Sequence, residues 1–148
     1  MPNKFHFFII SLSIVLQLAV LARAENNMSR TDCNFNKGPC TTRLGKSDLI
    51  ITLDINPKPL NAMSELHFSV MINQDIAPVR NATVTVDLTM PGMYMGENQV
   101  LLKKSKDNTY EGSGIIPVCP SGAKAWMAEV NVKIDDIMHS ANYVFELK

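Results

Sequence analysis

The chain of 148 residues has no surplus of either charge, since 14 lysine and arginine residues stand against 14 aspartate and glutamate residues. A protein that holds nucleic acid by its phosphates needs a face rich in lysine and arginine. The densest basic run here is Lys103-Lys104-Ser105-Lys106, which is too short for such a face and is typical of a solvated hairpin loop. The composition therefore argues against nucleic acid as a partner.

The chain also lacks the motifs on which common enzymes depend. It has no C-x-x-C dithiol, no serine in a G-x-S-x-G turn and no glycine-rich loop placed to hold a phosphate. Beyond residue 24 only His67 and His139 remain as imidazole bases. Asp135 and Asp136 are sequence neighbours rather than two carboxylates across a cleft. The sequence therefore predicts a protein that is not an enzyme, and it shows no pattern for a small-molecule substrate.

Long hydrophobic runs are absent except at the N-terminus. Lys4 precedes an apolar run over residues 5–21, and Ala22-Arg23-Ala24 places small residues where a signal peptidase cleaves. This pattern predicts a signal peptide over residues 1–24, cleaved after Ala24, and a periplasmic or secreted mature protein. The alternative is an N-terminal membrane anchor, because about 17 apolar residues is the lower limit of a membrane span.

Cysteine is scarce, and all three residues lie beyond the predicted cleavage site, at Cys33, Cys40 and Cys119. In an oxidising compartment two of them are expected to form a disulfide. The bridge is either Cys33–Cys40, which closes a short loop, or Cys40–Cys119, which ties the N-terminal segment to the second half of the domain. The sequence leaves both pairings open. The turn Cys119-Pro120-Ser121-Gly122 is typical of a disulfide-linked turn, and the alternative is a thiolate metal ligand or redox-active thiol.

Residues 25–47 are polar and show no apolar periodicity, which predicts an N-terminal arm. From residue 48 onward apolar and polar residues alternate in short runs separated by proline, glycine, asparagine and aspartate. Seven such strands at this spacing are typical of an antiparallel β-sandwich of the immunoglobulin-like type, forming one domain over residues 48–148. Trp126 is expected at the centre of the core. The predicted strands cover residues 49–55, 66–72, 84–88, 100–102, 110–116, 126–134 and 143–147.

Three methionines lie within six residues at a proline–glycine turn, in Met90-Pro91-Gly92-Met93-Tyr94-Met95. Thioethers are soft ligands that suit Cu(I), and the pattern predicts a copper site at Met90, Met93 and Met95. His67, on an outward strand face, is a further candidate ligand. The alternatives are that these methionines fill gaps beneath a loop or form a patch that binds a protein partner.

These motifs resemble those of the YtkA-like and FixH-like domains, which are exported or membrane-anchored bacterial β-sandwich proteins. The similarity lies in a strand that runs into Met90-Pro91-Gly92-Met93, in Tyr110-Glu111-Gly112, and in a strand that starts at Ala125-Trp126. The resemblance covers about 100 residues and its most specific element is the Met-Pro-Gly-Met turn. It implies a cell-envelope role near copper resistance or copper-oxidase assembly. The cleavage site after Ala24 departs from the FixH-like pattern of an N-terminal anchor.

Together these features predict a non-catalytic periplasmic module that binds Cu(I), or a copper-trafficking partner, through the methionine loop. The expected partner is an envelope protein or a component of copper-enzyme assembly. The alternative function is a metal-free structural or protein-interaction domain of the cell envelope, in which the same loop packs or contacts a protein. The sequence does not indicate the oligomeric state.

Overall fold

The computed structural model describes residues 29–45, 47–105 and 107–148, and the predicted signal peptide lies outside these residues. Every regular element in them is a strand, so the predicted all-β antiparallel fold is confirmed. This part of the chain contains no helix long and apolar enough to cross a bilayer. The strands are β1 (Ser29–Asp32), β2 (Cys40–Leu44), β3 (Leu49–Asn56), β4 (Glu65–Gln74), β5 (Ala77–Pro78), β6 (Thr83–Thr89), β7 (Gln99–Lys104), β8 (Thr109–Ile115), β9 (Ala125–Ile134) and β10 (Ile137–Glu146).

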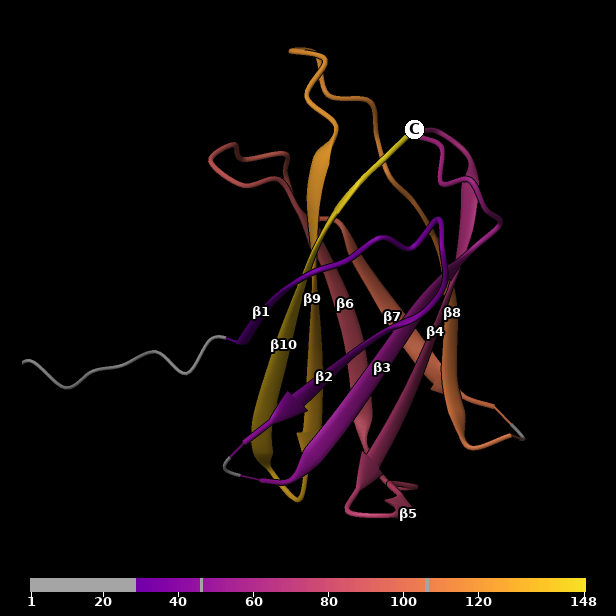
Figure 1. Ribbon diagram of the computed structural model, residues 1–148, viewed down its shortest axis with the longest axis vertical. Coiled ribbons are helices and arrows are strands. Elements are labelled where there is room, and N and C mark those ends of the chain that lie inside the picture. Colours follow the sequence, from indigo (N-terminus) through magenta and orange to yellow (C-terminus); the bar gives the residue numbers. More distant parts are fainter. Residues whose placement is uncertain (1–28, 46, 106) are drawn as a thin grey trace, which may run out of the picture.

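The strands form one continuous ten-stranded sheet that folds over on itself into two halves, which Figure 1 shows from β1 and β10 on one side to β8 on the other. Sheet A has the order β1-β10-β9-β6-β7, and sheet B has the order β8-β4-β3-β2 with β5 beside β4. The sheets are joined where Lys103 and Lys104 of β7 pair with Glu111 and Tyr110 of β8. The chain passes from the β3–β4 hairpin to the β6–β7 hairpin, back to β8 beside β4, and then to β9 beside β6. This Greek-key path is the one that immunoglobulin-like sandwiches use.

The core lies between the sheets and is built from the inward residues of each alternating strand. Trp126 on β9 is fully buried, as predicted, and so are the inward residues of β3, β4 and β6. Tyr143 of β10 spans the two layers, because its hydroxyl donates a 2.7 Å hydrogen bond to the carbonyl oxygen of Ile51 in β3. Burial raises the pKa of Tyr143 to about 12, so the neutral phenol is the form that the core favours.

Gly112 and Gly114, which interrupt the apolar pattern of β8, allow β7 to pass close to that strand. A Cβ at Gly112 would lie 2.8 Å from the carbonyl oxygen of Leu101, and one at Gly114 would lie 2.5 Å from Val100 Cγ2. Any side chain at these positions would push β7 away from β8. The two glycines therefore make the joint between the sheets possible.

The segment predicted to be a polar arm contributes strands to both sheets. β1 pairs in parallel with β10, and β2 pairs in antiparallel with β3. Between them Phe35 is 1% exposed and packs edge-to-face on Phe145, with ring centroids 5.3 Å apart. The prediction missed these strands because they are short and because a single aromatic residue produces no periodicity.

The last strand also begins earlier than predicted. β10 starts at Ile137 and not near residue 143, so His139 lies within this strand, opposite Val132 of β9. The connection is only Asp135-Asp136, whose φ angles of 45° and 65° form a tight two-residue hairpin turn. Aspartate tolerates this left-handed conformation, which explains two acidic residues in sequence without a metal site.

Candidate functional site

The predicted copper ligands lie in loop 90–98, which connects β6 to β7 at one end of the sandwich. Met90 continues the inward side of β6 and is 5% exposed, so it packs in the core. Gly92, with a φ of 78°, turns the chain so that the amide of Met93 donates a 3.1 Å hydrogen bond to the carbonyl oxygen of Met90. Met93 is 42% exposed, and Met95 is half-buried against the core. The loop therefore holds its three thioethers at three different depths.

A second loop, 116–124 between β8 and β9, brings a cysteine to the methionine loop. Cys119 is free and buried, and its Sγ lies 3.6 Å from Met93 Sδ, with the thiol as donor. We call these two sulfurs the Cys119–Met93 pair. No sequence pattern joins them, because they are 26 residues apart and lie in two different loops, one within the β6–β7 hairpin and one that crosses from β8 to β9.

The turn after Cys119 stabilises the thiolate form of its side chain. The Ser121 hydroxyl oxygen lies 3.0 Å from Cys119 Sγ, and the turn is closed by a 2.9 Å hydrogen bond from the Gly122 amide to the Cys119 carbonyl oxygen. The hydrogen bond with Ser121 lowers the pKa of the Cys119 thiol, and backbone amides of the turn act in the same direction, although burial opposes them. A thiol with a lowered pKa is a better metal ligand, because the thiolate is the binding form.

His67 does not join this pair. It lies on the outer face of β4, where its Nε2 is 3.9 Å from a carboxylate oxygen of Glu111 on β8. Half of its side chain is exposed to solvent. Within the described residues, no group of three or more histidine, cysteine, aspartate or glutamate side chains could hold a metal ion.

The remaining cysteines form the disulfide Cys33–Cys40, so the short bridge is the one present of the two pairings that the sequence left open, and the prediction of a disulfide-linked turn at Cys119 is wrong. This bridge connects the end of β1, in sheet A, to the start of β2, in sheet B. It closes the side of the sandwich opposite the β7–β8 joint. Cross-linking over a loop of this length stabilises the fold by about 2.5 kcal/mol.

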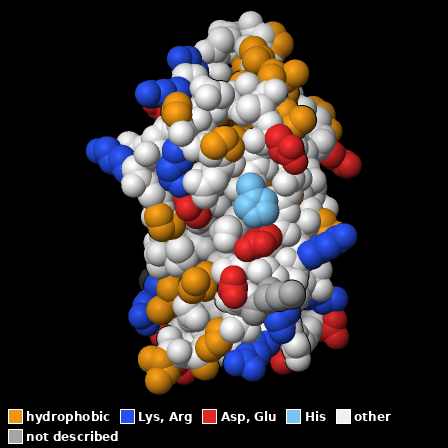
Figure 2. Space-filling view, turned by 90° about the vertical axis from the view of Figure 1, so that its right-hand side faces the viewer, with side chains coloured by type: hydrophobic (Ala, Val, Ile, Leu, Met, Phe, Trp, Pro, Cys, Tyr) orange, Lys and Arg blue, Asp and Glu red, His pale blue; other side chains and the backbone are white. Residues whose placement is uncertain are grey.

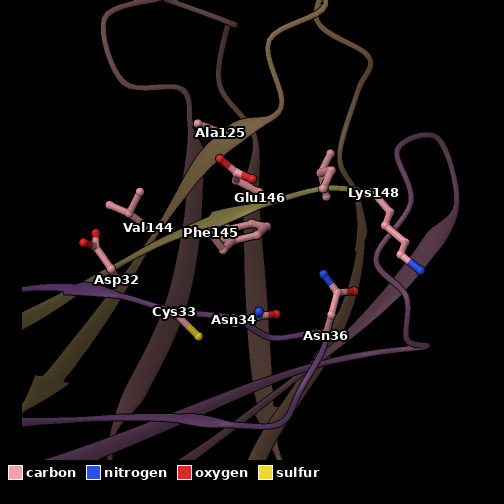
Figure 3. Close-up of a pocket in the computed structure, with 10 residues that line it drawn as sticks. Asp32, Cys33, Asn34, Asn36, Ala125, Val144, Phe145, Glu146 and Lys148 are labelled. Atoms are coloured by element: carbon pink, nitrogen blue, oxygen red, sulfur yellow. The ribbon is translucent and has the colours of Figure 1, made fainter.

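A pocket of about 610 Å³ lies beside the disulfide, between the β1–β2 connection and the end of β10. Figure 3 shows Cys33, Asn34 and Asn36 along one wall, with Phe145, Glu146 and Lys148 along the other. The Asn36 side chain accepts a 2.9 Å hydrogen bond from the Leu60 amide, so it has a structural role. The described lining offers charges of both signs, and it contains no free thiol, imidazole or hydroxyl group.

Exposed apolar side chains surround the Cys119–Met93 pair. Tyr94 is 86% exposed and Val118 is 60% exposed, and each is adjacent in sequence to one member of the pair. Met63, 66% exposed, lies at the same end, because its amide donates to the carbonyl oxygen of Ile116 at 2.8 Å. Figure 2 shows hydrophobic side chains on the surface at both the upper and the lower end of the face that it presents.

The structure thus brings Met93 and Cys119 together, keeps Met95 nearby on the same loop, packs Met90 into the core and leaves His67 on another face. Proline and glycine at the Cys119 turn were a signal that this cysteine lies in a loop, but not which loop faces it. No family model, curated protein or solved structure matches this chain.

Proposed function

We propose that the protein is a non-catalytic, extracytoplasmic binding module that holds Cu(I) through the Cys119–Met93 pair. The observation that supports this most directly is the 3.6 Å separation of Cys119 Sγ and Met93 Sδ, in a loop sequence that resembles the YtkA-like domains. Sulfur is the donor that Cu(I) prefers, and the pair supplies one anionic and one neutral sulfur.

The distance between Cys119 Sγ and Met93 Sδ is compatible with one metal ion bound to both sulfurs. Two sulfurs that each lie about 2.3 Å from one metal ion are separated by about 4 Å in a trigonal arrangement. The observed 3.6 Å requires only a small adjustment of flexible side chains. Met95, half-buried on the same loop, is the third ligand of the proposal, and its unbranched side chain has the flexibility that a movable ligand needs.

The two sulfur-containing side chains differ in solvent exposure, and this gives them different roles in the proposal. Cys119 is 4% exposed, and Met93 is 42% exposed. In the proposal an incoming ion meets the neutral thioether of Met93 first, and the thiol of Cys119 then loses one proton to solvent and would hold the ion as a thiolate. An ion shielded in this way from solvent remains open to exchange with a partner protein that approaches the Met93 side.

A competitive Cu(I) titration of the purified full chain against a chromogenic chelator tests the proposal. Stoichiometric binding is expected, weakened about tenfold or more in Met93→Leu, which keeps the shape and apolarity but removes the thioether. Met138→Leu is the matched control, since Met138 is also well exposed but lies in the β10 strand. Equal affinities of the wild type and Met93→Leu would refute a thioether ligand, and absence of binding in the wild type would refute the copper site.

A metal-free interaction module is the second candidate function, and the exposure of Tyr94, Met93 and Val118 favours it. In this case the loop end contacts an envelope protein directly. If the wild type binds no Cu(I) but Tyr94→Ala abolishes binding to an envelope partner, this second function replaces the first.

A further inference from the structure

Exposed hydrophobic side chains lie at both ends of the sandwich, and those at the end opposite loop 90–98 have no role in the copper proposal (Figure 2). Three of them lie in or beside hairpin turns, and we call Ile76, Ile137 and Met138 the apolar tips. Ile76, between β4 and β5, is 99% exposed, and Ile137 and Met138, at the start of β10, are 61% and 59% exposed. Single exposed aliphatic side chains are ordinary, but three at one end form a surface that another body can cover.

The two turns that carry the apolar tips lie at the same end of the molecule (Figure 1). Residues 79–82 connect β5 to β6, and the first residue of β6, Thr83, pairs with Lys133 near the end of β9. β6 then runs away from this end and leads into loop 90–98. The apolar tips and the Cys119–Met93 pair are therefore at opposite ends of the sandwich.

The chain also enters the fold from the end that carries the apolar tips. β1 runs parallel to β10, and Ser29 lies opposite Ala141, four residues after Ile137. Four residues of strand correspond to about 13 Å. Seven residues, 22–28, lie between the apolar run 5–21 and β1, and seven residues span at most about 25 Å. A bilayer that holds residues 5–21 is therefore within reach of the apolar tips.

The charges beside the apolar tips indicate which kind of bilayer suits them. Lys133 forms a 2.7 Å ion pair with Asp136, so its charge is compensated. Asp75 directly precedes Ile76, and Asp135 lies in the other turn, so the turns carry carboxylates and no cluster of lysines. An anionic lipid surface repels such carboxylates. The match is a zwitterionic surface, into which exposed aliphatic side chains partition because they leave water.

We propose that the apolar tips rest on the surface of a lipid bilayer in which residues 5–21 remain as the anchor, which is the alternative to cleavage after Ala24. The anchor makes the tip contact intramolecular, so three side chains are enough to hold the domain against the bilayer, although they are too few to hold a free domain there. The Cys119–Met93 pair then faces away from the bilayer, toward the soluble phase. The proposal does not depend on copper binding.

Tryptophan fluorescence in vesicles tests this proposal, because the native Trp126 is fully buried in the core and supplies a constant background. The full chain is made by cell-free synthesis with phosphatidylcholine vesicles, so that no signal peptidase acts on it. With lipid brominated in its acyl chains near the headgroup, Ile76→Trp is expected to lose about half or more of its added emission, because bromine quenches a tryptophan that it contacts. Tyr94→Trp is the matched control, since Tyr94 is 86% exposed at the opposite end and its added emission should not change.

Equal quenching of the two variants overturns the proposal, and so does quenching of neither in a chain that floats with the vesicles. A chain that does not float with the vesicles overturns it as well, because the anchor is then absent. The double variant Ile76→Asn, Ile137→Asn separates tip contact from folding, since neither side chain belongs to the core. On vesicles its amides at residues 75–77 should exchange with solvent several-fold faster than those of the wild type, with unchanged stability to urea. Equal exchange in both proteins overturns the contact.

Discussion

The Cys33–Cys40 disulfide and the Cys119–Met93 pair differ in what their sulfur atoms do for the molecule. Cys33 and Cys40 are consumed in a disulfide that connects the two sheets beside the buried ring of Phe35. Cys119 is free, buried in a loop, and in contact with the thioether of Met93. One region uses sulfur to hold the fold together, and the other keeps sulfur available beneath a partly exposed methionine. A cysteine that remains reduced next to a soft neighbour is a candidate ligand rather than a structural link.

The largest effect that would sharpen this contrast is expected from Phe35→Ala. The ring fills the space beneath the disulfide loop against Tyr143 and Phe145, so its removal is expected to cost about 3–5 kcal/mol of unfolding free energy. Urea denaturation measures the loss. Tyr94→Ala, at an exposed aromatic residue, is the control and should change stability by less than about 0.5 kcal/mol. Equal losses in the two variants would contradict a core role for residues 29–45.

Removal of the disulfide is expected to have the second-largest effect on the free energy of unfolding. The double variant Cys33→Ser, Cys40→Ser is expected to lose about 2.5 kcal/mol of unfolding free energy, because the unfolded chain regains the entropy of a closed loop. Cu(I) affinity should stay within about twofold of the wild type at a temperature where both are folded. If copper binding is lost while the fold persists, the two sulfur regions are not independent.

Cys119→Ser is expected to show the opposite pattern. It should weaken Cu(I) binding about tenfold or more, which corresponds to about 1.4 kcal/mol, because a hydroxyl is a poor ligand for a soft ion. Its unfolding free energy should fall by less than that of the disulfide variant. Titration and urea denaturation on the same sample measure both quantities. A variant that loses stability but keeps its copper affinity would assign Cys119 to packing alone.

The smallest expected effect is that of Ser121→Ala on the thiol. The hydrogen bond from Ser121 holds the pKa of Cys119 below its usual value, so the variant should titrate at higher pH in thiolate absorbance. Because a proton competes with the ion for the thiolate, Cu(I) affinity should decline as the pH falls through the Cys119 pKa, and this decline should begin at higher pH in Ser121→Ala. An unchanged titration curve would contradict a stabilised thiolate.

Local sequence patterns were sufficient to predict most of the strands in the fold. Alternation predicted β3, β4, β6, β7, β8 and β9 to within about two residues, because these strands place buried residues on one face, although Tyr110 is the one buried residue of β8. Alternation failed to predict strands whose formation depends on pairing with strands far along the chain. β1 and β2 are too short to show a period, and β10 begins at a two-residue turn whose aspartates resemble a loop.

The candidate site was predictable only in part, for the same reason. The cluster Met90, Met93 and Met95 is visible in the sequence, but the depth of each side chain is set by the inward side of β6 and by the turn at Gly92. The contact between Met93 and Cys119 forms between the β6–β7 hairpin loop and the β8–β9 crossover loop, which a linear pattern does not represent. His67 was proposed from its outward position alone, and an outward face of sheet B does not lead to loop 90–98.

X-ray absorption spectroscopy of the Cu(I)-loaded protein at the copper edge tests the central claim most directly. The account predicts an all-sulfur first shell of two or three atoms at about 2.3 Å, reduced by one sulfur in Met93→Leu. A first shell that contains nitrogen, or a sulfur shell unchanged in both Met93→Leu and Cys119→Ser, would place the ion elsewhere and contradict the account.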